Sequence, residues 1–419
     1  MSSLKETLRS LLPTPLVSLY HLLLAYLGAW RYGFPSRRLI LIGVTGTKGK
    51  SSTTEMVNAV LEEAGYKTAV LNSIRIKVAE RSEANLMRMS MPGRAFIQKF
   101  LRGAVNAGCT AAILEMTSQG AAQNRHRALE LDAFIFTNLA PEHIESHGSY
   151  EAYADAKLEL AKQLVRSKKR PRIMVVNGDD EQSARYLALG VEKKVAYSLS
   201  GNEPYGAGEH GGYLTFSGLR VPVSLPGEFS LKNALAAAEV SRAMGVAPET
   251  IARGIKKVTH IPGRAERIES GQDFTVIVDY AHTPDSLEAI YRAYPGEKIA
   301  VLGSMGGSRD TWNRPVKARI AAEHCRRVIL TNEDPCDDDP KKIVEEMARG
   351  VPKGARAEII IDRREAIRSA IAGAKSGETV LITGKGTDPW IYGPGGTKIP
   401  WSDAGVAREE LQKRLAHTV

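Results

Sequence analysis

The chain has 419 residues, 43% of them hydrophobic and 25% charged, which is typical of a globular protein with two or three domains. Lysine and arginine outnumber aspartate and glutamate by 57 to 47, and the net charge of +10 suits an anionic ligand such as a nucleotide or nucleotide-sugar. The sequence has neither a long basic block nor a basic stripe with interleaved aromatic residues, so we expect no nucleic-acid partner. Its cysteines, Cys109, Cys325 and Cys336, show no C-x-x-C spacing, which disfavours a disulfide framework or zinc site and indicates a reducing cytoplasm.

The first predicted element is an apolar run from Leu16 to Trp30, inside an N-terminal segment of residues 1–38. The run is shorter than the about 20 apolar residues that a membrane-spanning helix needs. It also lacks the basic start and the cleavage site of a signal peptide. Three interpretations stay open: a helix packed on the core, a peripheral membrane contact through residues 11–38, and a true span. In the second interpretation, the protein is cytoplasmic and contacts the membrane at its surface, and Trp30, Tyr26 and Tyr32 lie near the lipid headgroups.

From residue 39 onward, short apolar strands alternate with helices. This alternation predicts a mostly parallel sheet covered by helices on both faces. The predicted strands are 39–44, 68–71, 111–115, 133–137 and 172–177, the helices are 51–64, 94–107, 150–164, 230–244 and 248–258, and a small hairpin section occupies 201–226.

The stretch from His260 to Arg264 reads H-I-P-G-R and marks a predicted domain boundary. A second alternation follows, with strands at 276–279, 298–302, 327–330, 358–361 and 379–382 and helices at 284–294, 315–324, 341–349, 363–374 and 403–415. The fold class is therefore α/β. We expect a central P-loop domain over 39–260 with a mostly parallel sheet, and a Rossmann-like C-terminal domain over 261–419.

The strongest motif is V-T-G-T-K-G-K-S-S, from Val44 to Ser52, between a predicted strand and a predicted helix. Its glycines let backbone N–H groups face a phosphate chain, and the helix N-terminus adds a positive dipole end. Lys50 can reach the β- and γ-phosphates, and Ser51 can hold Mg²⁺. A glycine-rich turn without a ligand is the alternative, which the strand–loop–helix context disfavours.

Polar side chains follow two further strands of the central domain. Glu115 ends a strand at the edge where phosphates bind, so it can coordinate Mg²⁺. Ser118, Gln123 and Arg125 come next, and a guanidinium suits a substrate carboxylate. After the next strand comes His143, which with its neighbours reads either as ordinary loop polarity or as a metal or phosphate edge; beside a P-loop we favour the second.

The C-terminal domain repeats this arrangement at its own strand ends. One strand delivers Asp279 and His282 to the edge where ligands of open α/β sheets bind. Loops with Arg309, Asp334 and Lys385 follow three other strands. These loops lie at one edge and predict the lip of a pocket.

Together these motifs resemble those of the Mur ligases over about residues 39–415. The most specific stretches are T-G-T-K-G-K-S-S, T-N-L-x-x-E-H, V-D-Y-A-H-T-P-D-S-L-E and G-K-G. The resemblance is closest to the branch that adds a diamino acid to UDP-N-acetylmuramoyl-dipeptide. It implies an ATP-dependent, ADP-forming amide ligase of peptidoglycan precursor synthesis, in which a carboxylate becomes an acyl phosphate and is then attacked by an amine.

The resemblance also implies roles for individual residues, with ATP and Mg²⁺ as cofactors. Lys157 matches a lysine that reacts with CO₂ to become a carbamate metal ligand. The implied metal ligands are Ser51, Glu115, His143 and carbamylated Lys157. The implied catalytic residues are Lys50, Lys157, Glu115 and His143. The implied ATP-binding residues are Thr45, Gly46, Thr47, Lys48, Gly49, Lys50, Ser51, Ser52, Asn233, Arg264 and Asp279. The implied substrate-binding residues are Ser90, Ser118, Gln123, Arg125, His282, Arg309, Asp334 and Lys385.

Three departures from the family pattern bear on the substrates. A short apolar segment stands where the family has a uridine-binding domain. The D-N-P-R motif of enzymes that select diaminopimelate reads E-D-P-C from Glu333 to Cys336, which removes a bidentate grip on a second carboxylate and favours lysine, ornithine or another amino acid. The substrate loop reads Ser90-Met-Pro92, and the G-K-G-H-E loop reads G-K-G-T-D.

Two other functions stay open. The first is a Mur-like ligase on a lipid-linked or non-peptidoglycan acceptor, of the polyglutamate or cyanophycin type. The second is a non-catalytic nucleotide-binding protein that tethers a cell-wall assembly, which the intact phosphate motif disfavours.

Overall fold

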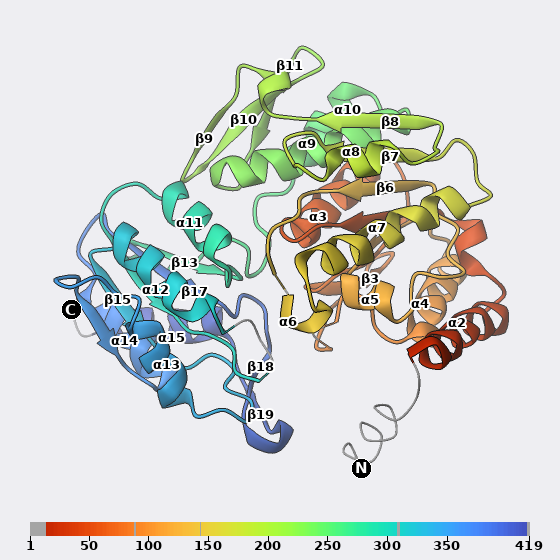
Figure 1. The fold of residues 1–419 in the computed structure, drawn as a ribbon. Helices are drawn as coiled ribbons and strands as arrows, with labels where there is room; N and C mark the ends of the chain where they lie inside the picture. Colours follow the sequence, from red (N-terminus) through yellow and green to blue (C-terminus); the bar gives the residue numbers. More distant parts are fainter. Residues whose placement is uncertain (1–13, 88, 143, 308–310, 417–419) are drawn as a thin grey trace.

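The computed structural model describes residues 14–87, 89–142, 144–307 and 311–416. Two α/β units lie side by side, each built on its own sheet (Figure 1). The larger sheet has eight strands in the order β4-β3-β2-β5-β1-β6-β7-β8, and the second has six in the order β12-β13-β17-β14-β15-β16. The predicted fold class is confirmed.

The larger sheet is parallel except for the hairpin at one edge. Its parallel strands are β1 (Ile40–Thr45), β2 (Thr68–Leu71), β5 (Ala111–Glu115), β6 (Ala133–Phe136), β7 (Ile173–Asn177) and β8 (Lys193–Tyr197). The edge hairpin is β3 (Arg75–Val78) and β4 (Arg81–Ala84). Sequence patterning did not reveal this hairpin, because β4 is exposed along its whole length and carries no apolar alternation.

Helices cover both faces of this sheet, and the residues of β1 alternate between the two cores. Ile42 and Val44 pack with α3 (Lys50–Glu63), α9 (Gly227–Ala243) and α10 (Pro248–Lys256). Leu41 packs on the other face with α4 (Arg94–Asn106), α7 (Tyr150–Arg166) and α8 (Ser183–Leu187). This period of two is what a strand buried on both faces requires. The expected hairpin section is a small antiparallel sheet of β9 (Gly206–Gly208), β10 (Gly211–Phe216) and β11 (Leu219–Val223).

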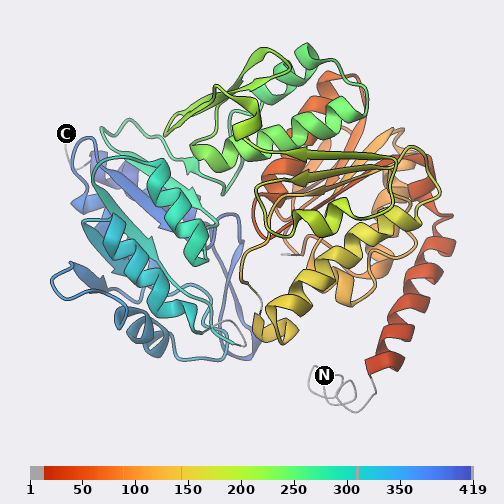
Figure 2. The same cartoon turned by 45° about the horizontal axis from the view of Figure 1, so that its top comes forward.

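The apolar N-terminal run forms α2 (Thr14–Arg31), which packs against α4 at the outside of the central unit (Figure 2). Arg102 of α4 holds its C-terminal end by donating Nε to the carbonyl oxygen of Tyr32 at 2.7 Å. One face of α2 is buried, with Ala29 fully covered, and the other is exposed. Among the described residues, no helix has the length and apolar character needed to cross a membrane.

The second sheet is parallel except for β12 (Glu266–Arg267). Its other strands are β13 (Thr275–Asp279), β14 (Lys298–Leu302), β15 (Arg327–Leu330), β16 (Ala357–Ile359) and β17 (Thr379–Thr383). One face is covered by α11 (Pro284–Ala293), α12 (Asn313–His324) and α13 (Pro340–Ala348), the other by α14 (Arg363–Gly373) and α15 (Asp403–Ala416). A hairpin of β18 (Trp390–Tyr392) and β19 (Lys398–Pro400) extends from it.

A buried ion pair joins the N-termini of α14 and α15. Arg363 donates Nε to Oδ1 of Asp403 at 2.8 Å and Nη2 to Oδ2 at 2.7 Å, and both side chains are essentially unexposed. Removing one partner of such a pair leaves an uncompensated buried charge. We expect Asp403→Ala to lower the unfolding free energy of the C-terminal unit by about 3–5 kcal/mol, measured by urea unfolding.

The matched control is Glu323→Ala, which removes an exposed helical ion pair with Arg319. It should change the same free energy by less than about 1 kcal/mol. Equal losses in the two variants would contradict the assignment.

Candidate active site

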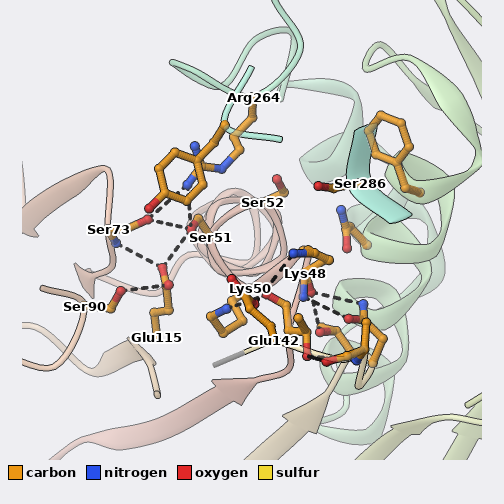
Figure 3. A pocket seen from close by; sticks show the side chains of 18 of the residues that line it. Lys48, Lys50, Ser51, Ser52, Ser73, Ser90, Glu115, Glu142, Arg264 and Ser286 are labelled. Atoms are coloured by element: carbon orange, nitrogen blue, oxygen red, sulfur yellow. Dashed lines mark hydrogen bonds and ion pairs between the residues drawn. The ribbon is translucent and has the colours of Figure 1, made fainter. Parts of the chain in front are cut away.

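A cavity of about 500 Å³ lies where the two units meet (Figure 3). The central unit contributes the P-loop, the residues that follow β5 and β6, and the N-terminal part of α9. The C-terminal unit contributes the residues after β13 and the face of α11. Parallel strands end at this edge of both sheets, as the sequence predicted for a ligand site.

At two positions of the P-loop, the space and the backbone conformation allow only glycine. Gly46 and Gly49 have φ values of 150° and 77°, which L side chains rarely adopt. A Cβ on Gly46 would lie 1.9 Å from Oγ1 of Thr137, and one on Gly49 would lie 2.2 Å from Oδ1 of Asn233. Asn138 secures the loop from β6 by accepting the backbone N–H of Lys48 at 2.8 Å. The loop is therefore fixed between β6 and α9, with α3 beginning at Lys50.

Glu115 accepts three hydrogen bonds in the cavity (Figure 3). Its Oε2 accepts hydrogen bonds from Oγ of Ser51 at 2.8 Å and the backbone N–H of Ser73 at 3.0 Å, and its Oε1 accepts one from Oγ of Ser90 at 2.8 Å. Burial raises the pKa of Glu115, but the charge of Lys50 and these hydrogen bonds outweigh it, so the net shift is downward. The group is a carboxylate at neutral pH.

Two lysines of this site, the partly buried Lys50 and the buried Lys157, are close to other cations. Lys50 donates Nζ to the carbonyl oxygen of Thr47 at 2.9 Å. Burial lowers its pKa, and Lys48 and Arg264 add to the shift. Lys157, from α7, donates Nζ to the carbonyl oxygen of Gly46 at 2.7 Å. Burial, followed by the charge of Lys50, holds its pKa well below the ordinary lysine value.

The C-terminal unit reaches the P-loop through Arg264. Its Nη2 lies 3.2 Å from Oγ of Ser73 and 3.4 Å from Oγ of Ser51. Asp279, at the end of β13, accepts the backbone N–H of Ala265 at 2.6 Å, so the same carboxylate orders the turn that carries Arg264. Burial raises the pKa of Asp279, against the opposing charge of Arg264.

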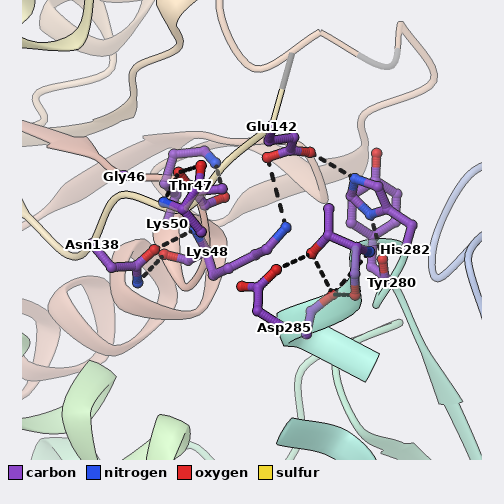
Figure 4. Close-up of polar contacts among 12 residues, drawn as sticks. Gly46, Thr47, Lys48, Lys50, Asn138, Glu142, Tyr280, His282 and Asp285 are labelled. Carbon is purple, nitrogen blue, oxygen red and sulfur yellow. Dashed lines mark hydrogen bonds and ion pairs between the residues drawn. The ribbon is translucent and has the colours of Figure 1, made fainter. Parts of the chain in front are cut away.

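A second contact between the units passes through Glu142 (Figure 4). Oε1 of Glu142 lies 2.8 Å from Nε2 of His282, and Oε2 lies 3.6 Å from Nζ of Lys48. Nδ1 of His282 lies 2.7 Å from the carbonyl oxygen of Tyr280, which orients the ring. One carboxylate therefore joins the P-loop to the C-terminal unit.

The predicted acceptor-binding residues lie at the other end of the cavity. Ser118 starts the short helix α5 (Ser118–Ala122), and its Oγ lies 3.1 Å from Nε2 of His147. Arg125 donates Nη2 to Oε1 of Gln123 at 2.6 Å and Nη1 to the carbonyl oxygen of Met91. Ser118 and Arg125 line the cavity, as does Ser90, whereas Gln123 lies behind Arg125 and holds it.

Apart from Gln123, the predicted site residues divide into four groups. The structure brings Thr47, Lys48, Gly49, Lys50, Ser51, Ser52, Ser90, Glu115, Ser118, Arg125, Lys157, Asn233, Arg264, Asp279 and His282 to one cavity. Thr45 and Gly46 lie behind it as part of the P-loop support. Asp334 and Lys385 lie apart from it as a buried ion pair, with Nζ of Lys385 2.7 Å from Oδ1 of Asp334. His143 and Arg309 lie outside the described residues.

Sequence reasoning gave no role to three residues that the structure places in contact with this site. Ser73 bonds Ser51 and Glu115, and it could have been found because it follows β2 at the same sheet edge. Glu142 is part of the T-N-L-x-x-E-H motif, but the motif alone gave it no role of its own. Tyr153 lies under the loop with its hydroxyl 3.1 Å from Oγ1 of Thr47, and no local signal in the sequence distinguishes it from an ordinary core tyrosine.

The donor set is suited to Mg²⁺ bound together with phosphates. Among the described residues no group of three His, Cys, Asp or Glu side chains could enclose a metal ion by itself. Mg²⁺ binds through one or two protein oxygens, substrate phosphates and water rather than in an all-protein cage. Ser51 and Glu115 offer these oxygens side by side.

Comparisons with known proteins agree with this geometry. The family description "Mur ligase middle domain" matches residues 44–241, and "Mur ligase, glutamate ligase domain" matches residues 263–386. The chain is 37% identical to the UDP-N-acetylmuramyl-tripeptide synthetase of Roseiflexus sp. (strain RS-1), over 93% of this chain and 81% of that protein. It is 35% identical to the UDP-N-acetylmuramoyl-L-alanyl-D-glutamate--2,6-diaminopimelate ligase of Geobacillus kaustophilus (strain HTA426), over 96% and 85%. A solved structure of a ligase with the same name superposes with a TM-score of 0.63 at 26% identity, over 93% of this chain and 82% of that one.

The phosphate role of Lys50 has a direct test. We expect Lys50→Ala to lower phosphate release from ATP about 100-fold or more, because it removes a donor aimed at the transferring group. Lys194→Ala, an exposed lysine at the start of β8, is the control and should leave the rate unchanged. Similar rates for wild type and Lys50→Ala would reject the assignment.

Proposed function

The chain belongs to the Mur ligase family of ATP-dependent, ADP-forming amide ligases of peptidoglycan precursor synthesis, and on this premise we propose how its own residues carry out the reaction and which substrates they select. The observation that carries the proposal is the bonded group of Ser51, Ser73, Ser90 and Glu115 beside Lys50. It offers oxygen ligands and a cation within one buried site.

In the first step, an oxygen of the acceptor carboxylate attacks the γ-phosphorus of ATP. The bond to the β-phosphate oxygen breaks, and ADP leaves with the electron pair. Lys50 and Arg264 neutralise charge on the phosphate oxygens. Mg²⁺, held by Ser51 and Glu115, would neutralise further charge there. Ser118 and Arg125 orient the acceptor at the other end of the cavity.

In the second step, the neutral amine of the incoming amino acid attacks the acyl carbon, and phosphate leaves with the electron pair of the C–O bond. The amide nitrogen then releases its extra proton. The contacts of Arg264 and His282 with the central unit enclose both steps between the two units and limit access of water to the acyl phosphate.

We also propose that Lys157 carries a carbamate. Only a neutral amine attacks CO₂, and the lowered pKa of Lys157 supplies that form nearer to neutral pH than an exposed lysine would. The carbamate would be an anion beside Lys48 and Lys50, where it relieves the repulsion between cations. It would also add oxygen ligands next to the P-loop, where Nζ of Lys157 bonds the carbonyl oxygen of Gly46.

The incoming amino acid is proposed to be one without a second carboxylate, such as lysine or ornithine. Cys336 offers no guanidinium where the diaminopimelate motif has one. The neighbouring Glu333 is buried, and its Oε2 accepts no hydrogen bond from the described residues. A buried carboxylate oxygen of this kind favours an ammonium group. Asp334 is less available for this role, because its Oδ1 already accepts hydrogen bonds from Lys385 and from the backbone N–H of Tyr392.

A peripheral contact of α2 with the membrane is part of the proposal. Its exposed face carries Trp30 and Tyr26 close to Arg31, a combination typical of helices at the membrane interface.

Phosphate release with purified protein, Mg²⁺, bicarbonate and a muramoyl-dipeptide acceptor tests the activity and the choice of amino acid together. We expect turnover with lysine or ornithine and little with diaminopimelate. Cys336→Arg should raise kcat/KM for diaminopimelate by about 10-fold or more, the worth of one charge-assisted bidentate contact. Cys109→Ala is the control. Efficient use of diaminopimelate by the wild type would reject the proposed selectivity, and turnover with no amino acid on any acceptor would reject the proposed function.

The carbamate has a spectroscopic test that does not depend on turnover. After incubation with ¹³C-bicarbonate near pH 7.5, the wild type should show a lysine carbamate resonance that Lys157→Met lacks. Because the pKa of Lys157 is lowered, the signal should persist at a pH where exposed lysines are protonated and unreactive. Lys194→Met should keep the resonance. A wild-type spectrum without it would reject the carbamate.

A further inference from the structure

The exposed apolar side chains of the central unit are confined to two segments. Among the described residues up to 260, every exposed large hydrophobic side chain lies on α2 or on the loop of residues 85–92. On α2 they recur every three or four positions and are 46–72% exposed: Leu16, Leu19, Tyr20, Leu23, Tyr26, Leu27 and Trp30. The loop adds Leu86 and Met89. A contiguous stripe of this size on a helix marks an interaction surface rather than scattered exposure.

The opposite face of α2 is firmly packed. His21, Ala25 and Ala29 are buried. Arg102 of α4 donates to the carbonyl oxygens of both Tyr32 and Gly33, which fixes the helix end. The helix that carries the exposed stripe is therefore fixed to the central unit.

The residues next to the stripe carry only positive charge. No aspartate or glutamate occurs between Glu6 and Glu55. Arg31, Arg37 and Arg38 are exposed at the C-terminal end of the helix, next to Trp30. An apolar stripe with an aromatic residue and arginines at its end, and no acidic group, complements the surface of an anionic lipid bilayer.

The stripe continues toward the acceptor end of the cavity. Asn124 donates Nδ2 to the carbonyl oxygen and to Oγ of Ser18 in α2, both at 3.1 Å. The next residue, Arg125, lines the cavity, and its Nη1 lies 4.0 Å from Sδ of Met89, which lines it too. The N-terminal half of α2 thus lies beside the residues that form this wall of the active site.

We propose that the acceptor is an amphiphile held in the bilayer: a peptide carboxylate whose far end is joined to a long-chain lipid. The stripe of α2 lies in the interface of an anionic bilayer, and the exposed side chains of Leu86 and Met89 receive the part of the acceptor next to its lipid. This inference rests on the proposed function, in which Ser118 and Arg125 orient the acceptor carboxylate.

The test compares one muramoyl-peptide acceptor in two forms, lipid-linked in phosphatidylglycerol-containing vesicles and free of lipid in solution. The full-length wild type should float with the vesicles and show a kcat/KM at least tenfold higher for the lipid-linked form. The variant Leu19→Ser/Leu23→Ser/Leu27→Ser should lose flotation and this advantage, but keep the wild-type rate on the soluble form. Ile359→Ser/Ile399→Ser, which changes exposed hydrophobic residues of the C-terminal unit, should keep both.

The outcomes separate this inference from the proposed function. Turnover of the soluble acceptor with no flotation, or equal kcat/KM for both forms, would overturn the lipid-linked acceptor and leave the ligase intact. A dimer that the triple variant dissociates, without flotation of the wild type, would assign the stripe to a second copy of the chain and also overturn it. Loss of turnover on every acceptor would reject the proposed function and the inference with it.

Discussion

Positive charge gathered around the P-loop is the constraint on which the rest of this site depends. Lys48, Lys50, Lys157 and Arg264 gather there, and Glu115 and Glu142 are the carboxylates that oppose them most directly. Burial and mutual repulsion lower the pKa of Lys50 and of Lys157, so part of the site's charge is held at an energetic cost. A polyphosphate removes that cost when it binds, and for this reason the site selects such a ligand more strongly than any single hydrogen bond could.

The parallel sheets are what bring these groups together. β1, β5 and β6 are neighbours that end at one edge, so Lys50, Glu115 and Asn138 converge although they are far apart in the sequence. The N-terminus of α3 points its unpaired N–H groups to the same place. β13 does the equivalent in the second unit with Asp279, whose carboxylate orders the turn carrying Arg264.

This convergence explains which residues could be predicted from the sequence. Most strands and helices follow from apolar runs, and the cavity residues Lys50, Glu115 and Asp279 follow from strand ends and a phosphate motif, because these are local signals. Lys157, on α7, was indicated only by the resemblance to the Mur ligases, and the strand β8 of the central sheet was not predicted. The pairing of Asp334 with Lys385 did not follow, because two residues at one sheet edge can face the cavity or each other, and only packing decides. The exposed strand β4 was missed because no burial pattern marks it.

Glu142 shows why such details matter for function. Its two carboxylate oxygens face different units: one bonds His282 and the other pairs with Lys48 of the P-loop. A phosphate that arrives at Lys48 competes with Glu142 for that pairing. Because a single carboxylate serves both contacts, the charge at the P-loop and the position of the C-terminal unit are not independent.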